Sequence, residues 1–489
     1  MIKLNNANLA TLPADVARPT YDRSKLTTGI VHFGVGGFHR AHQAMYLDRL
    51  MNRGEALDWG ITGVGVMPSD QRMRDALNGQ DGLYTLMVKH PDGHYEASVI
   101  GSIIDILYAP DDPEAVIELM AAPSTRIVSL TITEGGYNFH HVTGEFDLGN
   151  ADVVHDLAAG AAPKTVFGLV TEALRRRRAR LIAPFTVMSC DNIQSNGDVA
   201  KKMFCAYASA KDADLGDFIA SHVAFPNAMV DRITPVTTPE DIAEVARRFG
   251  IDDAWPVVCE PFTQWVIEDH FPLGRPAFEK VGAQMVADVV PYELMKLRLL
   301  NASHQALTYF GYLAGYRYAH EVTGNPLFAQ FLLDYMTLEG TPTLSPVPGV
   351  DLDDYRHTLI ARFSNPEVRD TLARLCAESS DRIPKWLLPV IRAQLKAGGD
   401  ISRSAAVVAS WARYAEGVDE QGRPIEVVDR LKDKLMAIAS HNRDNPTAFI
   451  ENRELFGDLA DEPRFVAAYR EALASLHSAG ALETVRRYC

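Results

Sequence analysis

The sequence predicts an α/β protein in which a doubly wound parallel sheet is followed by a mainly α-helical domain. Over the first 285 residues, short apolar runs that end in glycine or polar residues alternate with helix-like segments. Beyond about residue 290 the strand signals fade, and helix-like segments such as 326–335, 366–377 and 404–415 dominate. These two observations predict the fold class.

The length of the chain predicts more than one domain, because 489 residues exceed what a single hydrophobic core supports. We place the domains at residues 1–285 and 286–489. A break near residue 220 is the alternative, since residues 212–216 (DADLG) look like a linker. The net charge of −15 argues against nucleic acid as a partner, because phosphate binding needs a basic surface.

Cysteine usage and the start of the chain predict a cytoplasmic protein. The five cysteines are scattered and never form Cys-x-x-Cys, which disfavours a zinc finger or a disulfide scaffold and fits a reducing compartment. The first residues have no apolar signal region, and no apolar run is long enough to span a bilayer. We therefore expect no membrane partner and no metal site.

The strands are predicted in order from apolar runs. The first covers residues 29–33, and a helix-like segment follows from Ala41 to about Arg53. A second strand covers residues 59–66, and the other candidates are residues 84–88, 127–132 and 185–189.

The last two of these candidates are near-continuous apolar runs, which is typical of buried parallel strands. Functional residues of such sheets gather just past the carboxyl ends of the strands. Glu134 follows one strand and Asn192 follows the other, so we predict that both side chains point into one crevice.

The loop at residues 34–40 (GVGGFHR) lies between a strand and a helix, where a Rossmann-type dinucleotide fingerprint belongs. Gly34 and Gly36 allow a tight turn and a close approach of the backbone to a pyrophosphate. The third glycine position holds His39, so helix and strand are not expected to pack as closely there. A structural turn is the alternative interpretation of a lone Gly-x-Gly.

Asp70, after the second strand, is the candidate acid for the adenosine ribose, although it lies farther along the chain than the usual ~20 residues. A carboxylate there repels a 2′-phosphate and favours NAD over NADP. The nearby Arg72 and Arg74 would act in the opposite direction.

Residues 292–304 (YELMKLRLLNASH) are predicted to form the catalytic helix. At about 100° per residue, Asn301 lies about 140° and His304 about 80° around the helix from Lys296, and Glu293 lies about 60° away. A lysine beside an amide and an imidazole can take a proton from an alcohol and hold the alkoxide. An ordinary packed helix is the alternative, and the nucleotide loop upstream favours catalysis.

Three segments carry a resemblance to a known family: the loop with its continuation to residue 43, residues 225–235 (FPNAMVDRITP), and residues 296–304. They resemble the polyol-specific long-chain dehydrogenases, the mannitol dehydrogenase family, and the similarity covers essentially the whole chain. The resemblance implies a monomer that oxidises D-mannitol reversibly to D-fructose with NAD and without a metal. Arabinitol 4-dehydrogenases and the reductases of fructuronate and tagaturonate belong to the same family and remain alternatives.

The resemblance also implies roles for the catalytic residues. Lys296 matches the general base, Asn192 and Asn301 match the pair that stabilises the oxyanion, and His304 matches the residue that orients the substrate. A lysine with its ordinary pKa of ~10.4 is mostly protonated near neutral pH, so desolvation or the positive nicotinamide must lower that pKa.

Further residues follow from the resemblance in the same way. Asp231, Arg374 and Arg382 match residues that bind the polyol, and Arg382 keeps the charge where the family member compared has lysine. Glu134 and Glu293 match a proton relay to solvent. Two of these residues have alternative structural interpretations. Asp231 would form an ion pair between the domains, and Arg374 would be a surface cation. Glu293 would alternatively complement a helix dipole. The predicted cofactor-binding residues are Gly34, Gly36, Gly37, Phe38, His39, Arg40, Asp70, Thr133 and Glu134.

Overall fold

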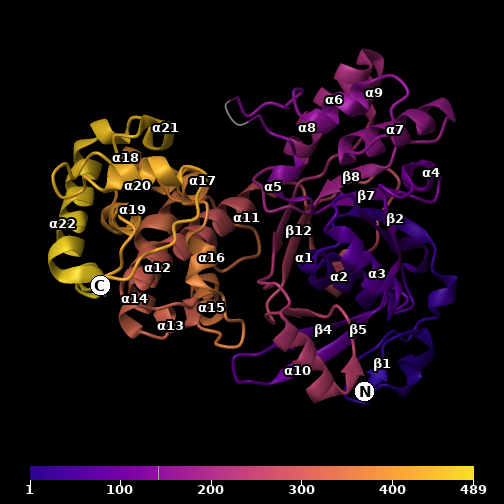
Figure 1. The fold of residues 1–489 in the computed structure, drawn as a ribbon, viewed down its shortest axis with the longest axis horizontal. Coiled ribbons are helices and arrows are strands. Elements are labelled where there is room, and N and C mark those ends of the chain that lie inside the picture. The colour runs from indigo at the N-terminus through magenta and orange to yellow at the C-terminus, as the bar shows by residue number, and fades with distance from the viewer. Residues whose placement is uncertain (141–142) are drawn as a thin grey trace. The chain divides into compact units, whose positions relative to one another are not determined.

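The computed structural model describes residues 1–140 and 143–489 and divides into two compact units, Met1–Val289 and Val290–Cys489 (Figure 1). The first unit holds a parallel sheet with helices, and the second consists of helices. The predicted fold class is therefore confirmed. In the described part of the chain, every helix is too short or too polar to cross a membrane.

The central sheet of the first unit has five parallel strands in the order β6-β3-β2-β7-β8. The chain passes from β2 to β3 and β6 on one side, and then to β7 and β8 on the other. The order reverses between β2 and β7, and ligands of such sheets bind at the carboxyl ends of the strands at that point. The strands are β2 (Thr28–Phe33), β3 (Gly60–Gly65), β6 (Ile103–Tyr108), β7 (Ile127–Leu130) and β8 (Thr186–Ser189).

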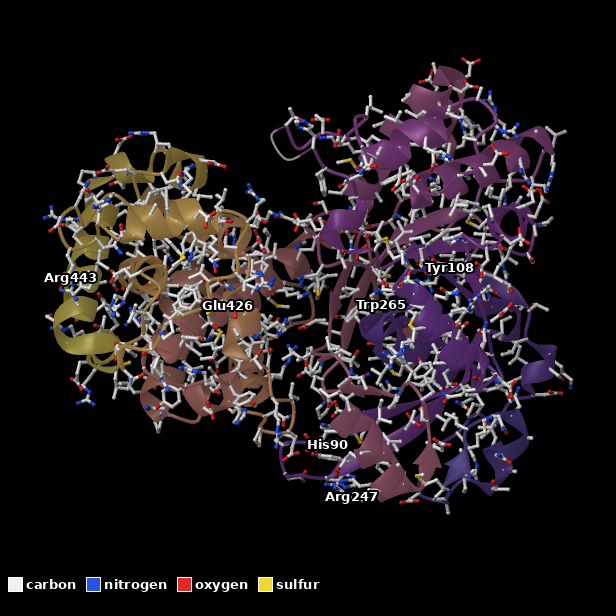
Figure 2. All side chains as sticks on the ribbon, in the orientation of Figure 1. His90, Tyr108, Arg247, Trp265, Glu426 and Arg443 are labelled. Carbon is white, nitrogen blue, oxygen red and sulfur yellow. The ribbon has the colours of Figure 1, made fainter. Side chains whose placement is uncertain are left out.

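Both faces of this sheet are buried, as the continuous apolar runs predicted. Along β2, Ile30 belongs to one hydrophobic core, whereas Val31 and Phe33 belong to a second core on the opposite face. The first of these cores also contains the fully buried Trp265 (Figure 2). Side chains that alternate between two cores explain why no polar face interrupts the strand.

Three smaller sheets, ten α-helices and four short 3-10 helices complete the described part of the first unit. The sheets are β1 (Ile2–Lys3) with β10 (Ile251–Asp252); β11 (Val257–Cys259), β4 (Tyr84–Lys89) and β5 (Tyr95–Ile100); and β13 (Gln284–Val286), β12 (Gln264–Glu268) and β9 (Ala228–Asp231). The helices are α1 (Gly37–Ala41), α2 (Gln43–Met51), α3 (Asp70–Asn78), α4 (Pro113–Ala121), α5 (Thr133–Gly136), α6 (Ala151–Leu157), α7 (Val166–Ala179), α8 (Asn196–Lys211), α9 (Ala213–His222) and α10 (Pro239–Phe249).

In the second unit, α12 packs against α16 and α19, and α19 packs against α22. Two π-helical segments, η5 (Lys296–Asn301) and η6 (Tyr335–Gly340), interrupt the α-helical pattern. The α-helices are α11 (Val290–Met295), α12 (Ala302–Leu313), α13 (Ala319–Thr323), α14 (Pro326–Asp334), α15 (Leu352–Phe363), α16 (Leu372–Cys376), α17 (Ser379–Trp386), α18 (Leu388–Ala397), α19 (Ser402–Tyr414), α20 (Lys432–Ala439), α21 (Arg453–Phe456) and α22 (Pro463–Arg486).

Two predicted helices differ from the structure. The helix expected from residue 41 breaks at His42, whose φ of −128° and ψ of −96° are not helical. The helix expected over residues 366–377 was wrong in its first half, because α16 begins only at Leu372. Arg369 has a φ of +50°, in the left-handed region, which no right-handed helix accommodates.

Candidate active site

The glycine loop between β2 and α1 has the shape that a dinucleotide requires. Gly34 has a φ of +89°, and a Cβ there would lie 2.0 Å from the carbonyl oxygen of Thr131, so no other residue fits. At Gly36, by contrast, a Cβ would lie 3.9 Å from its nearest neighbour, the carbonyl oxygen of Gly34. The space beside Gly36 is therefore open, and its backbone is accessible to a pyrophosphate such as that of NAD.

A stacked pair of histidines packs beside this loop. The ring of His39 stacks on that of His32 with centroids 3.4 Å apart. His32 Nε2 lies 2.9 Å from Thr131 Oγ1, and that hydroxyl donates to the carbonyl oxygen of Gly34 at 2.6 Å. Burial lowers the pKa of His32 to about 3, so the ring is neutral at physiological pH. A flat ring thus fills the position where the fingerprint has its third glycine.

Three residues that were predicted to bind the cofactor differ from one another in their exposure. His39 and Arg40 are each only 1% exposed. Arg40 lies over the ring of Tyr84 at 5.1 Å, and the Tyr84 hydroxyl donates to the Arg40 carbonyl at 2.6 Å. Phe38 is partly exposed and stacks on His42. The side chains of His39 and Arg40 therefore position the loop, and only Phe38 has a side chain accessible to a ligand.

Asp70 begins α3 at the carboxyl end of β3, the neighbour of β2. Its Oδ2 accepts hydrogen bonds from the backbone N–H groups of Val66 at 3.0 Å and Met67 at 2.9 Å. Within the described part of the chain its Oδ1 makes no hydrogen bond. Asp70 thus fixes the turn after β3 with one oxygen and has the other available for a ribose hydroxyl.

Replacing Asp70 with asparagine tests its role in cofactor choice. Asp70→Asn retains an oxygen for the Val66 and Met67 amides but removes the negative charge. Charges about 4 Å apart interact by about 1–4 kcal/mol between bulk water and a protein surface. We therefore expect the ratio of kcat/KM for NAD to that for NADP to fall by about tenfold or more. An unchanged ratio would mean that another residue determines the choice between NAD and NADP. Asp75→Asn on the same helix is the control.

One buried carboxylate joins the two strand ends where candidate residues were predicted. Asp191, just after β8, accepts hydrogen bonds from Thr133 N at 2.8 Å, Ile132 N at 3.2 Å and the Tyr137 hydroxyl at 2.8 Å, all of which follow β7. Burial raises the pKa of Asp191 to about 6. Thr133 has a φ of +62°, a strained value for a threonine, which these bonds help to hold.

The loops that Asp191 joins carry Glu134 and Asn192, whose side chains are exposed. Asp191 itself was not among the predicted site residues. It lies two residues after a buried strand and immediately before Asn192, and that position was the signal available in the sequence.

The segment that contains Asp231 contributes structure as well as a candidate contact. Arg232 donates to the carbonyl of Ala41, at the end of α1, at 2.7 Å and to the carbonyl of Glu260 at 3.0 and 3.1 Å. It therefore anchors the helix that follows the glycine loop. Asp231 is buried at the end of β9 and pairs with Gln264 of β12.

In the second unit, the predicted catalytic segment has a π-helical turn. Lys296 and Asn301 are the first and last residues of η5, and they are 7% and 3% exposed. Because a π-helix closes its hydrogen bonds between residues i and i+5, these two residues are about one turn apart. The predicted separation of about 140°, which assumes an α-helix, is therefore wrong for this pair. Asn301 Nδ2 is buried and has no hydrogen-bond partner among the described residues.

The two flanking candidates lie in the adjoining α-helices. Glu293 is buried in α11, three residues before Lys296. His304 is buried in α12, and its ring lies against that of Phe363 with centroids 4.6 Å apart. Helix α11, segment η5 and helix α12 follow one another directly, so all four candidates belong to one continuous helical stretch.

The two predicted substrate arginines are engaged with the protein. Arg374 is 55% exposed and forms two parallel hydrogen bonds with Asp370, at 2.8 and 2.6 Å. Arg382 donates to the carbonyls of Arg374 and Leu375, near the end of α16. Asp370 therefore neutralises the charge of Arg374. Among residues 1–140 and 143–489, no three His, Cys, Asp or Glu side chains gather as a metal site would require.

Comparison with known protein families identifies both units. The mannitol dehydrogenase Rossmann domain matches residues 28–280, and the mannitol dehydrogenase C-terminal domain matches residues 288–477. The chain belongs to the mannitol dehydrogenase family. This membership accounts for the glycine loop of the first unit and for the helical second unit together.

Individual relatives match the chain along its whole length. It is 48% identical to a mannitol 2-dehydrogenase of Phaeosphaeria nodorum, over 100% of this chain and 86% of the relative. A mannitol 2-dehydrogenase of Aspergillus fumigatus is 47% identical, over 100% and 99%. Among solved structures, Pseudomonas fluorescens mannitol 2-dehydrogenase in ternary complex with NAD and D-mannitol is 48% identical, with a TM-score of 0.90 over 99% of both chains. A substrate-free D-sorbitol dehydrogenase is 38% identical, with a TM-score of 0.91 over 99% of this chain and 100% of that one.

Proposed function

We propose that this protein is an NAD-dependent polyol dehydrogenase that oxidises D-mannitol at C2 to D-fructose, reversibly and without a metal. The observation that carries the proposal is the buried Lys296 about one π turn from the buried Asn301, whose amide nitrogen has no hydrogen-bond partner among the described residues. This pair occurs in a chain that is 48% identical, from end to end, to an enzyme solved with NAD and D-mannitol.

The residues of the first unit fit NAD. The open backbone at Gly36 would hold the pyrophosphate, and Asp70 Oδ1 would accept a hydrogen bond from the adenosine ribose. Bound there, NAD would accept the hydride that leaves the carbinol carbon. Phe38 has the accessible side chain of the loop, whereas His39 and Arg40 act by fixing the course of the backbone.

The protein's own residues manage the proton and the charge on oxygen. The Lys296 amine accepts the proton of the reacting hydroxyl, and the amides of Asn192 and Asn301 donate hydrogen bonds to the oxygen as its negative charge develops. One such donor contributes about 2.7–4 kcal/mol to stabilising the transition state. His304 orients the same oxygen, and Glu293 and Glu134 then pass the proton from Lys296 to solvent.

The charge balance around the substrate residues favours a neutral polyol over a hexuronate. A hexuronate carboxylate needs an uncompensated cation, but Asp370 already neutralises Arg374. Arg382 is committed in part to backbone carbonyls. Asp231 and Arg374 can still exchange hydrogen bonds with hydroxyl groups. We therefore propose D-mannitol oxidation as the function rather than the reduction of fructuronate or tagaturonate.

D-Sorbitol is the second candidate substrate, because a D-sorbitol dehydrogenase matches the whole fold with a TM-score of 0.91. Sorbitol and mannitol differ only in the configuration at C2, so the two activities differ in which hydroxyl arrangement the site accepts. D-Arabinitol is the third, since the family that the sequence resembles also contains arabinitol 4-dehydrogenases.

A substrate panel tests the proposal. Initial rates of NADH formation with D-mannitol, D-sorbitol and D-arabinitol, and of NADH consumption with D-fructose and D-fructuronate, give kcat/KM for each. A wrong isomer leaves buried polar groups unmet at about 1–3 kcal/mol each, so D-mannitol should lead the other polyols by about tenfold or more. A higher kcat/KM for D-sorbitol, or for fructuronate over fructose, would overturn the assignment.

A further inference from the structure

The two π-helical segments of the second unit pack against each other. Segment η5 carries Lys296 and Asn301, and η6 begins at Tyr335. Segments of π-helix are rare, because they disrupt the regular hydrogen bonds of an α-helix and need other partners to compensate. They often occur at functional sites. The compensation for η5 comes from η6.

The π turn leaves one backbone carbonyl without its usual donor. In an α-helix the N–H of Ala302 would donate to the carbonyl of Arg298, four residues earlier. Here that N–H donates to the carbonyls of Leu297 and Leu299 and skips Arg298. The hydroxyl of Tyr335 donates to the Arg298 carbonyl instead, at 2.9 Å.

The surroundings make this hydroxyl a permanent donor. Tyr335 is 0% exposed, and burial raises its pKa well above the ordinary value, so the hydroxyl keeps its proton. Segment η6 also lies close to η5, because a Cβ on Gly340 would come within 2.8 Å of Leu299 Cδ2. The side chain of Gln394 holds η6 in turn, by donating to the carbonyls of Leu338 and Glu339.

The same hydrogen bond opposes a return to the α-helical register. In that register the N–H of Ala302 would donate to the Arg298 carbonyl, and the Tyr335 hydroxyl would have to share that acceptor. In the π register the buried hydroxyl has an acceptor that Ala302 does not use, and the Arg298 carbonyl keeps a donor. The π register is therefore favoured by one hydroxyl that is 37 residues away from Arg298 in the sequence.

We propose that Tyr335 is a positioning residue that holds η5 in its π register and thereby places Lys296 and Asn301 on the same side of the helix. In an α-helix the two residues would lie about 140° apart, and they could not serve one oxygen atom. The inference rests on the proposed function for the roles of Lys296 and Asn301. It adds a residue that contacts neither substrate nor cofactor.

The kinetic test replaces Tyr335 with phenylalanine. Tyr335→Phe should lower kcat for D-mannitol by about tenfold to a hundredfold, because small displacements of catalytic groups have effects of this size. NAD binding, followed by fluorescence titration, should change by less than about twofold. With Asn301→Ala already in place, the added loss from Tyr335→Phe should be small, because residues that act as a unit are not additive. Independent, additive losses would overturn the proposal.

Tyr309→Phe is the matched control. Tyr309 is also fully buried in the second unit, and its hydroxyl bonds to Gln305 and Ser379, neither of which belongs to η5. Both variants lose a buried tyrosine hydrogen bond, so a comparable fall in Tm is expected. Tyr309→Phe should leave kcat within about twofold of the wild-type value. An equal loss of kcat in both variants would mean that general destabilisation explains the effect.

A crystal structure of the Tyr335→Phe protein tests the register directly and needs no substrate. We expect the N–H of Ala302 to donate to the Arg298 carbonyl, as in an α-helix. A retained π turn would overturn the proposal even if kcat falls. If the wild-type protein oxidised none of the polyols, only the proposed function would be wrong. The crystal structure of the Tyr335→Phe protein would still decide the role of Tyr335.

Discussion

Replacing Lys296 with alanine is expected to lower kcat for D-mannitol oxidation by about 10²- to 10⁴-fold, the usual contribution of a general base. NAD binding should persist, because Lys296 is not part of the glycine loop. The wild-type rate of oxidation should rise with pH as the lysine loses its proton. Reduction of D-fructose, in which the lysine returns that proton, should favour lower pH.

The contrast between two variants separates the base from a mere positive charge. Lys296→Arg keeps the charge, but a guanidinium with a pKa above ~12 does not accept a proton at working pH. Both Lys296→Ala and Lys296→Arg should therefore be inactive. If either variant retained more than about a tenth of the wild-type turnover between pH 7 and 10, Lys296 would not be the base.

Asn301→Ala should lower kcat by about 10²- to 10³-fold, with a much smaller effect on the KM for D-mannitol. Its amide nitrogen is buried and lacks a partner among the described residues, so it is available as a donor before the reaction begins. Such a preorganised donor acts mainly as charge develops in the transition state. Steady-state kinetics at saturating NAD measure the two parameters separately.

Asn452→Ala provides the control for Asn301→Ala. Asn452 is also a buried asparagine of the second unit, and its Nδ2 likewise has no partner in the described part of the chain. It precedes α21 and has no proposed role in catalysis. Its replacement should leave kcat within about twofold. A similar fall for both variants would show that losing a buried amide, rather than an oxyanion donor, explains the result.

Local sequence patterns predicted most of the fold. The apolar runs at β2, β7 and β8 were read correctly because both faces of the central sheet are buried, so no polar face interrupts the pattern. The glycine loop was found because Gly34 admits no side chain. Residues 366–371 were wrong, because the left-handed backbone of Arg369 has no local signal in the sequence.

The candidate site was harder to predict because long-range contacts determine its geometry. The sequence predicted a helix through residues 292–304, but the α-helical angles between its residues differ from the structure, since residues 296–301 form a π-helix in which the hydroxyl of Tyr335 donates to the carbonyl of Arg298. His39 was expected at the cofactor, yet its ring is stacked on His32 in the interior. Asp191 was missed, because its role depends on backbone amides that follow a different strand.

Product analysis in the presence of EDTA decides whether the protein is a metal-independent mannitol dehydrogenase. The purified protein, dialysed against EDTA, is incubated with NAD and D-mannitol, and NADH and the sugar product are both quantified. We predict one D-fructose for each NADH, formed at the rate of the untreated protein. Loss of activity that a divalent metal restores, or NADH formed without D-fructose, would contradict this function.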